Sequence, residues 1–178
     1  FIKYKLNKDL SLSGLSDGQV SFLSKIKYNL ESLKIEYQNL EKIATNNSVK
    51  REAIIRLMLG FENKANQQSD LYAGKVLALD KIDDGLKNRA SVILARSYFA
   101  QGNFQKAEKT FFTLSKNATD RVGAEATYMM AYLNYLNDSL QTAETIIYQL
   151  ANDFTADYWI AKGFILLADI YLQNGNNF

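Results

Sequence analysis

The sequence contains no cysteine, no histidine and no proline. Because there is no cysteine, the chain can form no disulfide bond, no thiolate nucleophile and no zinc site with cysteine ligands. The lack of histidine removes the commonest general base and the commonest transition-metal ligand. Proline interrupts the hydrogen bonds of a helix interior, so its absence is typical of helices joined by short corners.

The overall charge is also small. The 178 residues include 21 basic and 19 acidic ones, a net charge of +2, and 47% of the chain is hydrophobic. This balance gives no strong attraction to nucleic acid, and no apolar run approaches the roughly 18 residues that a membrane span needs. We therefore expect a soluble protein with no nucleic-acid partner and no transmembrane segment. The length fits one domain or a short repeat array.

Sequence signatures of catalysis are missing as well. The chain has no glycine-rich phosphate loop, no nucleophile elbow and no evident carboxylate pair, so we expect neither an enzyme nor a cofactor. Asp80, Asp83, Asp84 and Gly85 have the composition of a calcium loop, but their spacing is wrong and no closing glutamate follows. We interpret this segment as a helix end, a turn and an N-cap, and we expect no metal site.

The clearest pattern runs from Asn88 to Leu114 and predicts two helices with a tight corner between them. Gly102 and Asn103 break the pattern, and small Ala95 and Ala107 are expected where the two helices approach closely. Apolar residues recur at helical spacing on both sides of the break: Leu94, Ala95 and Tyr98 before it, and Phe104, Ala107, Phe111 and Leu114 after it. We expect Tyr98, Phe104 and Phe111 to fill the space around the contact.

Similar pairs of helical patterns precede and follow this one. The close-contact positions are Met58, Ala95, Ala131 and Ala168, which are separated by 37, 36 and 37 residues. Such regular spacing predicts a repeat array. Near the start, the patterns at 19–28 and 29–44 suggest a degraded helical hairpin, while 1–12 fits either an extended arm or the end of a helix.

The order Leu94-Ala95-x2-Tyr98, then Gly102, then Ala107-x3-Phe111 resembles the tetratricopeptide repeat (TPR). Ser91 stands in place of the family's first aromatic residue, and Thr119 in place of its closing proline. The resemblance implies an all-α, right-handed superhelical solenoid of antiparallel hairpins. Its expected parts are a divergent hairpin over 1–47 and TPR-like repeats over 48–84, 88–121, 124–157 and, incompletely, 161–178. The last segment, with Tyr158-Trp159 ahead of Ala168-Asp169-Ile170-Tyr171, is most similar to TPR proteins of the bacterial cell envelope, which slightly favours a periplasmic location.

In TPR arrays, defined positions of each first helix line a groove that holds a peptide or partner protein. Carried over to this chain, the resemblance implies these partner-binding residues: Arg89, Arg96 and Phe99; Glu125, Tyr128, Tyr132 and Tyr135; and Lys162 and Asp169. Tyr128, Tyr132 and Tyr135 follow one helical stripe, and aromatic and arginine side chains are enriched at binding hot spots. A stripe with this spacing can equally be packed as core, and both readings stay open here.

The resemblance implies a non-catalytic scaffold for protein–protein interaction. Two alternatives remain: a TPR segment of a larger envelope, transport or secretion assembly or of an enzyme with its catalytic module elsewhere, and a groove for a small ligand such as a glycan or peptide. Phe164, Leu167, Ala168 and Tyr171 form an apolar stripe near the end of the sequence. We expect either further repeats or a second copy of the chain to cover it.

Overall fold

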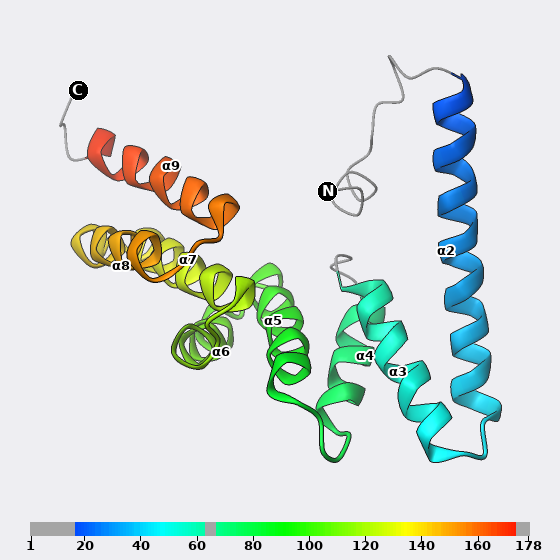
Figure 1. Ribbon diagram of the computed structural model, residues 1–178. Coiled ribbons are helices and arrows are strands. Elements are labelled where there is room, and N and C mark those ends of the chain that lie inside the picture. Colours follow the sequence, from blue (N-terminus) through cyan, green and yellow to red (C-terminus); the bar gives the residue numbers. More distant parts are fainter. Residues whose placement is uncertain (1–16, 63–66, 174–178) are drawn as a thin grey trace. The chain divides into compact units, whose positions relative to one another are not determined.

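The computed structural model describes residues 17–62 and 67–173. These residues form eight helices and no strand, which confirms the all-α class (Figure 1). The chain divides into two compact units, one ending at Asp80 and the other beginning at Lys81. The arm or helix end expected over 1–12 lies outside the described residues. The right-handed superhelix stays a prediction.

The first unit contains α2 (Asp17–Ile43), α3 (Asn47–Phe61) and α4 (Gln67–Leu77), and α3 packs against both of the others. The hairpin expected within 1–47 is wrong, because α2 is one continuous helix. The segment 19–44 contains no glycine, and the chain no proline, so no residue in it forces a break. Polar Asn29 is accommodated inside the helix.

The core of this unit is formed mainly by α3 and α4. Their buried apolar side chains are Ala53, Ile54, Leu57, Met58 and Phe61, and Tyr72, Ala73 and Val76; polar Ser69 of α4 is also buried. The rings of Phe61 and Tyr72 stack with their centroids 5.7 Å apart. Glu41 of α2 accepts a hydrogen bond of 3.0 Å from the Tyr72 hydroxyl and forms an ion pair with Lys75, which joins α2 to α4.

The second unit consists of α5 (Asp84–Ala100), α6 (Phe104–Asn117), α7 (Arg121–Leu136), α8 (Leu140–Asp153) and α9 (Asp157–Gln173). Each helix packs against the next one, and α7 also contacts both α5 and α9 (Figure 1). The first helices of successive pairs therefore lie next to one another. This row of α5, α7 and α9 positions the candidate site.

Two turns of the second unit have similar backbone geometry and lie 36 residues apart in the sequence. Gly102, between α5 and α6, has a φ of 74°, and Asp138, between α7 and α8, has a φ of 59°. In both turns the last backbone N–H donates an equivalent hydrogen bond to the preceding helix. These bonds join Asn103 N to Tyr98 O at 2.8 Å and Ser139 N to Asn134 O at 2.9 Å. The repeat that the sequence predicts is thus present in the backbone geometry of these two corners.

The buried side chains show the same offset. Ala107, Phe111 and Leu114 of α6 correspond to Ala143, Ile147 and Leu150 of α8, and all six are at most 3% exposed. Ala95 and Ala131 are fully buried at the matching positions of α5 and α7. The alanines expected at close helix contacts are therefore buried, as such contacts require.

Two expectations about single side chains are wrong. Phe104 is 49% exposed, because it is the first residue of α6 and lies beside the corner rather than between the helices. Ala168 is also exposed. The buried face of α9 carries Gly163, Leu166 and Ile170, so Ala168 points to the opposite side, where no helix of the described chain covers it.

The interpretation of the segment before α5 as a turn and an N-cap is confirmed. Lys81 takes a positive φ of 54° in the turn. Asp83 caps α5, since its side chain accepts a hydrogen bond of 2.8 Å from the backbone N–H of Leu86. Asn46 caps α3 in a similar way by accepting a hydrogen bond of 2.8 Å from the Ser48 N–H.

Candidate partner-binding face

A row of aromatic rings runs from the start of α6 across α5 and α7 to α9 and is here called the aromatic row. Its rings touch in sequence, and the centroid distances are 5.3 Å for Phe104 to Phe99, 5.9 Å for Phe99 to Tyr132, 6.2 Å for Tyr132 to Tyr128, 5.4 Å for Tyr128 to Trp159 and 4.9 Å for Trp159 to Tyr158. Tyr135 adds a branch at 6.3 Å from Tyr132. These spacings are those of interacting aromatic pairs.

The aromatic row changes from exposed to buried along its length. Its two ends are open, with Phe104 49% and Tyr158 42% exposed. Tyr128 and Trp159 are only 8% and 9% exposed and belong to the hydrophobic core between α7, α8 and α9. Phe99, Tyr132 and Tyr135 are half-buried. The stripe is therefore core at Tyr128, while Tyr132 and Tyr135 pack against this core and remain partly exposed.

Lys162 lies against the buried end of the aromatic row. Its ammonium is 5.1 Å from the ring centre of Tyr128, 5.5 Å from that of Trp159 and 5.7 Å from that of Tyr158. A cation within about 6 Å of a ring centre is attracted by the π-electrons. Lys162 therefore positions these three rings relative to one another and adds positive charge at this end of the row.

Arg96 and Glu125 meet where α5 packs on α7. The guanidinium donates from Nε to one carboxylate oxygen of Glu125 and from Nη2 to the other. Only 5% of the Glu125 side chain is exposed, compared with 34% of the Arg96 side chain. Glu125, expected to contact a partner, is instead buried and engaged by Arg96, and it orients that arginine.

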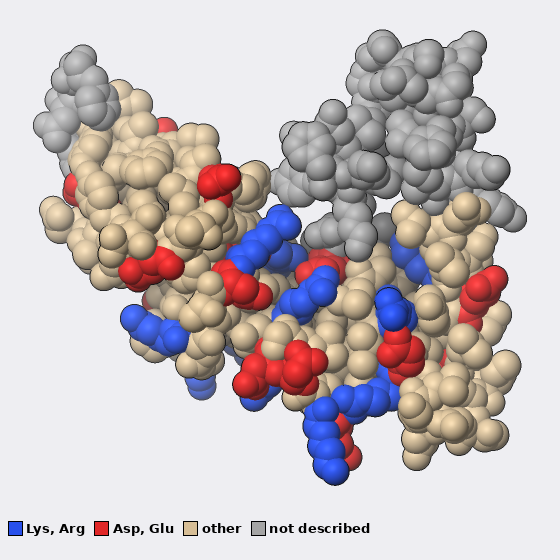
Figure 2. Space-filling model, in the orientation of Figure 1, with Lys and Arg blue, Asp and Glu red and all other residues tan. Residues whose placement is uncertain are grey.

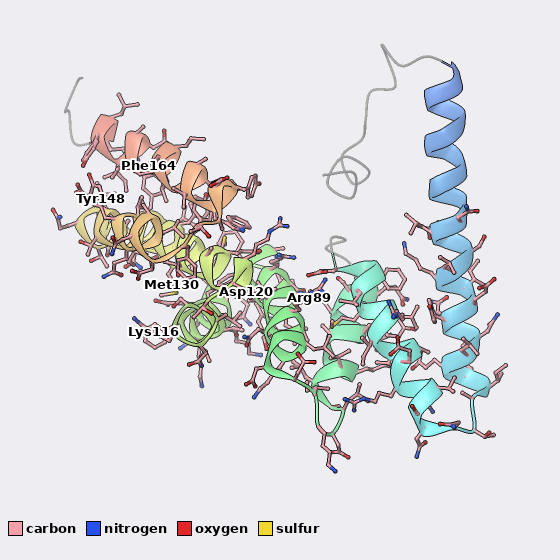
Figure 3. The ribbon with its side chains drawn as sticks, in the orientation of Figure 1. Arg89, Lys116, Asp120, Met130, Tyr148 and Phe164 are labelled. Carbon is pink, nitrogen blue, oxygen red and sulfur yellow. The ribbon has the colours of Figure 1, made fainter. Side chains whose placement is uncertain are left out.

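The remaining expected residues lie around this face without joining one cluster. Arg89, labelled in Figure 3, lies on α5 about two turns before Arg96 and is partly buried. Asp169 is exposed on α9, and its negative charge is one cause of a raised pKa at Tyr128. Gln173 follows it one turn later and donates a hydrogen bond of 2.9 Å to the Tyr135 hydroxyl.

Burial is the main cause of the raised pKa of Tyr128, because desolvation disfavours the phenolate. The neighbouring Tyr132, Tyr158 and Asp169 add repulsion toward a negative charge at the same position. At neutral pH the Tyr128 side chain is therefore uncharged and contributes a flat apolar surface to the face.

Phe104, Tyr158 and Trp159 belong to the aromatic row but were missed by the repeat-based positions. Phe104 follows the corner of its hairpin, and the other two lie in the first turn of α9. The positions carried over from the TPR pattern do not include the first residues of α6 or the first turn of α9. The signal in the sequence was the adjacent pair Tyr158-Trp159, which contains the chain's single tryptophan.

Over residues 17–62 and 67–173, no helix combines the length and apolar character needed to cross a membrane. Among the same residues, no three acidic side chains gather in an arrangement that could hold a metal ion. In comparisons with known proteins, no family model, no curated protein and no solved structure matches the chain significantly.

Proposed function

We propose that the chain is a non-catalytic helical-repeat scaffold, similar to TPR proteins, that binds a peptide or partner protein along the aromatic row. The single observation that carries the proposal is the continuity of this row from the start of α6 across α5 and α7 to α9. Its rings are exposed at both ends, half-buried at Phe99 and Tyr132, and buried at Tyr128 and Trp159. The 36-residue repetition of turns and core residues supports the family resemblance.

The physical character of the aromatic row suits binding. Half-buried rings present a large apolar area, and because their neighbours already fix their positions, little side-chain entropy is lost when a partner docks. Tyr132 lies in the middle of the row, and its hydroxyl makes no hydrogen bond within the described part of the chain. It can therefore bond to a partner while its ring stays packed.

The charged residues at this face make its two ends different for a docking partner. Lys162 carries its positive charge at the Trp159 end, and Arg96 is held in place by Glu125 at the α5–α7 contact. A partner segment with apolar or aromatic side chains and an acidic group near the Trp159 end would complement this arrangement. This is the class of ligand that the proposal favours.

The single tryptophan allows a direct test, because Trp159 lies in the aromatic row. Peptides selected from a random library against the folded chain would be titrated while Trp159 fluorescence is recorded. We expect Tyr132→Ala to weaken binding at least tenfold with unchanged circular dichroism. Phe112→Ala is the matched control, since Phe112 is 54% exposed on α6 and outside the row.

Two results would contradict the proposal. One is that no selected peptide changes the Trp159 signal, and the other is that Phe112→Ala weakens binding as much as Tyr132→Ala. Soluble oligosaccharides titrated in the same way address the small-ligand alternative. Saturable binding of a saccharide that competes with the peptides would assign the row to glycan recognition instead.

A further inference from the structure

One face of α9 is apolar and exposed, and it is here called the α9 stripe. Its members are Ala161, Phe164, Ile165, Ala168 and Leu172. The three large side chains are 47%, 66% and 60% exposed for Phe164, Ile165 and Leu172. At about 100° per residue these positions share one side of the helix, opposite Gly163, Leu166 and Ile170, which are buried.

No charged residue interrupts the α9 stripe. The helix has only three charged side chains, and of these Asp157 stands at its first residue while Lys162 and Asp169 follow one edge of the stripe. In Figure 2 the visible surface over the α8 and α9 part of the second unit is mostly uncharged, with acidic groups toward its margins. Figure 3 labels Phe164 on this helix.

The two edge charges restrict how a second copy could dock. Lys162 and Asp169 have opposite signs and are two helical turns apart. If two α9 helices paired in parallel about a two-fold axis, the charged edges of the two copies would lie on opposite sides of the interface, so Lys162 would not meet the partner's Asp169. In an antiparallel pair with its two-fold axis midway between positions 162 and 169, each lysine lies opposite the partner's aspartate.

The same register brings the apolar side chains together. The axis then passes beside Ile165 and Leu166, so the Ile165 side chains of the two copies lie near each other at the centre. Ala161 and Ala168 are small and allow the helices to approach closely, while the Phe164 and Leu172 side chains fill the space between them. Such a surface is self-complementary, as a two-fold interface requires.

We propose that two copies of this chain associate through an antiparallel α9–α9 pair centred on Ile165. The apolar side chains of the α9 stripe are not part of the aromatic row, so the dimer does not depend on the proposed function. Its register also uses Lys162 and Asp169, which border that row. Of the two coverings expected from the sequence, further repeats or a second copy, the proposal takes the second copy, to which the charge arrangement on α9 is complementary.

The first test is the mass in solution. Sedimentation equilibrium should give a dimer for the chain and a monomer for Ile165→Glu, because the substitution places two like charges at the centre of an apolar contact. Phe112→Glu is the matched control, an exposed aromatic residue on α6 that should leave the dimer intact. A chain that stays monomeric at its highest soluble concentration would overturn the proposal.

The absence of cysteine permits a sharper test of direction. With the axis at Ile165, a cysteine placed there lies within about 2 Å, measured along the helix, of its counterpart, whereas cysteines at Leu172 would be about 20 Å apart. Under mild oxidation, Ile165→Cys should form a covalent dimer and Leu172→Cys should not. Cross-linking of Leu172→Cys as fast as Ile165→Cys would indicate a parallel pair and refute the proposed interface.

Charge exchange tests the register independently. Lys162→Glu should weaken the dimer several-fold, since it opposes two acidic groups on each side of the axis, and adding Asp169→Lys should restore it. Circular dichroism confirms that each variant folds. If the double variant is no tighter than Lys162→Glu alone, the two residues do not face each other and the register is wrong.

Discussion

Arg96 of α5 and Glu125 of α7 form a two-pronged ion pair in which the carboxylate is almost completely buried and the guanidinium is only partly so. The pair joins the first helices of two successive repeats. The difference in burial decides how much stability each substitution costs. A buried charge that loses its partner has no water to replace the lost hydrogen bonds. Arg96 therefore serves the fold as well as the face that it borders.

We expect Arg96→Ala to destabilise the chain by about 2–4 kcal/mol, somewhat less than the loss at a completely buried pair, because Arg96 retains contact with water. Arg96→Met combined with Glu125→Leu should recover most of this loss, since apolar side chains of similar size need no counter-charge. Urea unfolding of the two variants measures the difference. Equal midpoints for the single and double variants would show that the unpaired carboxylate is not the cause.

Gly123 is the second position at which the packing predicts a large effect. A Cβ atom added there would lie 1.8 Å from the backbone oxygen of Ala118 and 3.0 Å from the Phe154 ring. Gly123→Ala should therefore cost about 3 kcal/mol, because backbone cannot move aside as a flexible side chain can. Gly74→Ala is the control. That glycine has no atom within 4 Å of the added Cβ, so alanine should instead stabilise α4 by roughly 0.5–1 kcal/mol.

The sequence predicts what is local in this fold. Helix spacing located α5 to α8, and Gly102 marked the turn between α5 and α6, because it acts through its own backbone angle. The buried alanines at 95, 107 and 131 were found because a small residue in a helical pattern often marks a close contact, although the same argument failed at exposed Ala168. The hairpin expected before residue 48 failed because two apolar stretches do not make two helices without a residue that breaks them.

The candidate site was less predictable, because it depends on how helices approach one another. Nothing near Glu125 in the sequence shows that its carboxylate is buried, since its partner Arg96 lies 29 residues earlier. The same applies to Phe104 and Phe111, of which only the second is buried, although both follow the repeat pattern. Sequence spacing fixed the face of each helix but not the depth to which neighbouring helices cover it.

The paired turns provide a third prediction, in which the same backbone angle is tested with two residues. Asp138→Gly should stabilise the chain by roughly 0.5–1 kcal/mol, because glycine adopts a positive φ without steric cost. Gly102→Ala should destabilise it by about 1 kcal/mol for the same reason. Thermal unfolding gives both values. Shifts of the same sign for the two variants would mean that the turns are not equivalent.

The raised pKa of Tyr128 predicts how stability depends on alkaline pH. Burial raises the pKa of the folded state above the usual value of about 10, so below that value both folded and unfolded chains keep the proton and stability is unaffected. Above about pH 10 the unfolded chain ionises more readily, and the folded state loses stability until the pH passes the folded pKa. Tyr72 also has a pKa raised by burial, so it contributes to the same loss in the first unit.

We therefore expect Tyr128→Phe to reduce the alkaline loss of stability without abolishing it. The Tyr128 hydroxyl has no hydrogen-bond partner among the described residues, so phenylalanine leaves no polar group unpaired and should fold normally at neutral pH. The measurement is the urea midpoint as a function of pH. Tyr72→Phe is the comparison in the first unit, and it also removes the hydrogen bond to Glu41. If Tyr128→Phe loses as much stability above pH 10 as the parent chain, then Tyr128 can ionise in the folded state and the buried end of the aromatic row is open to water.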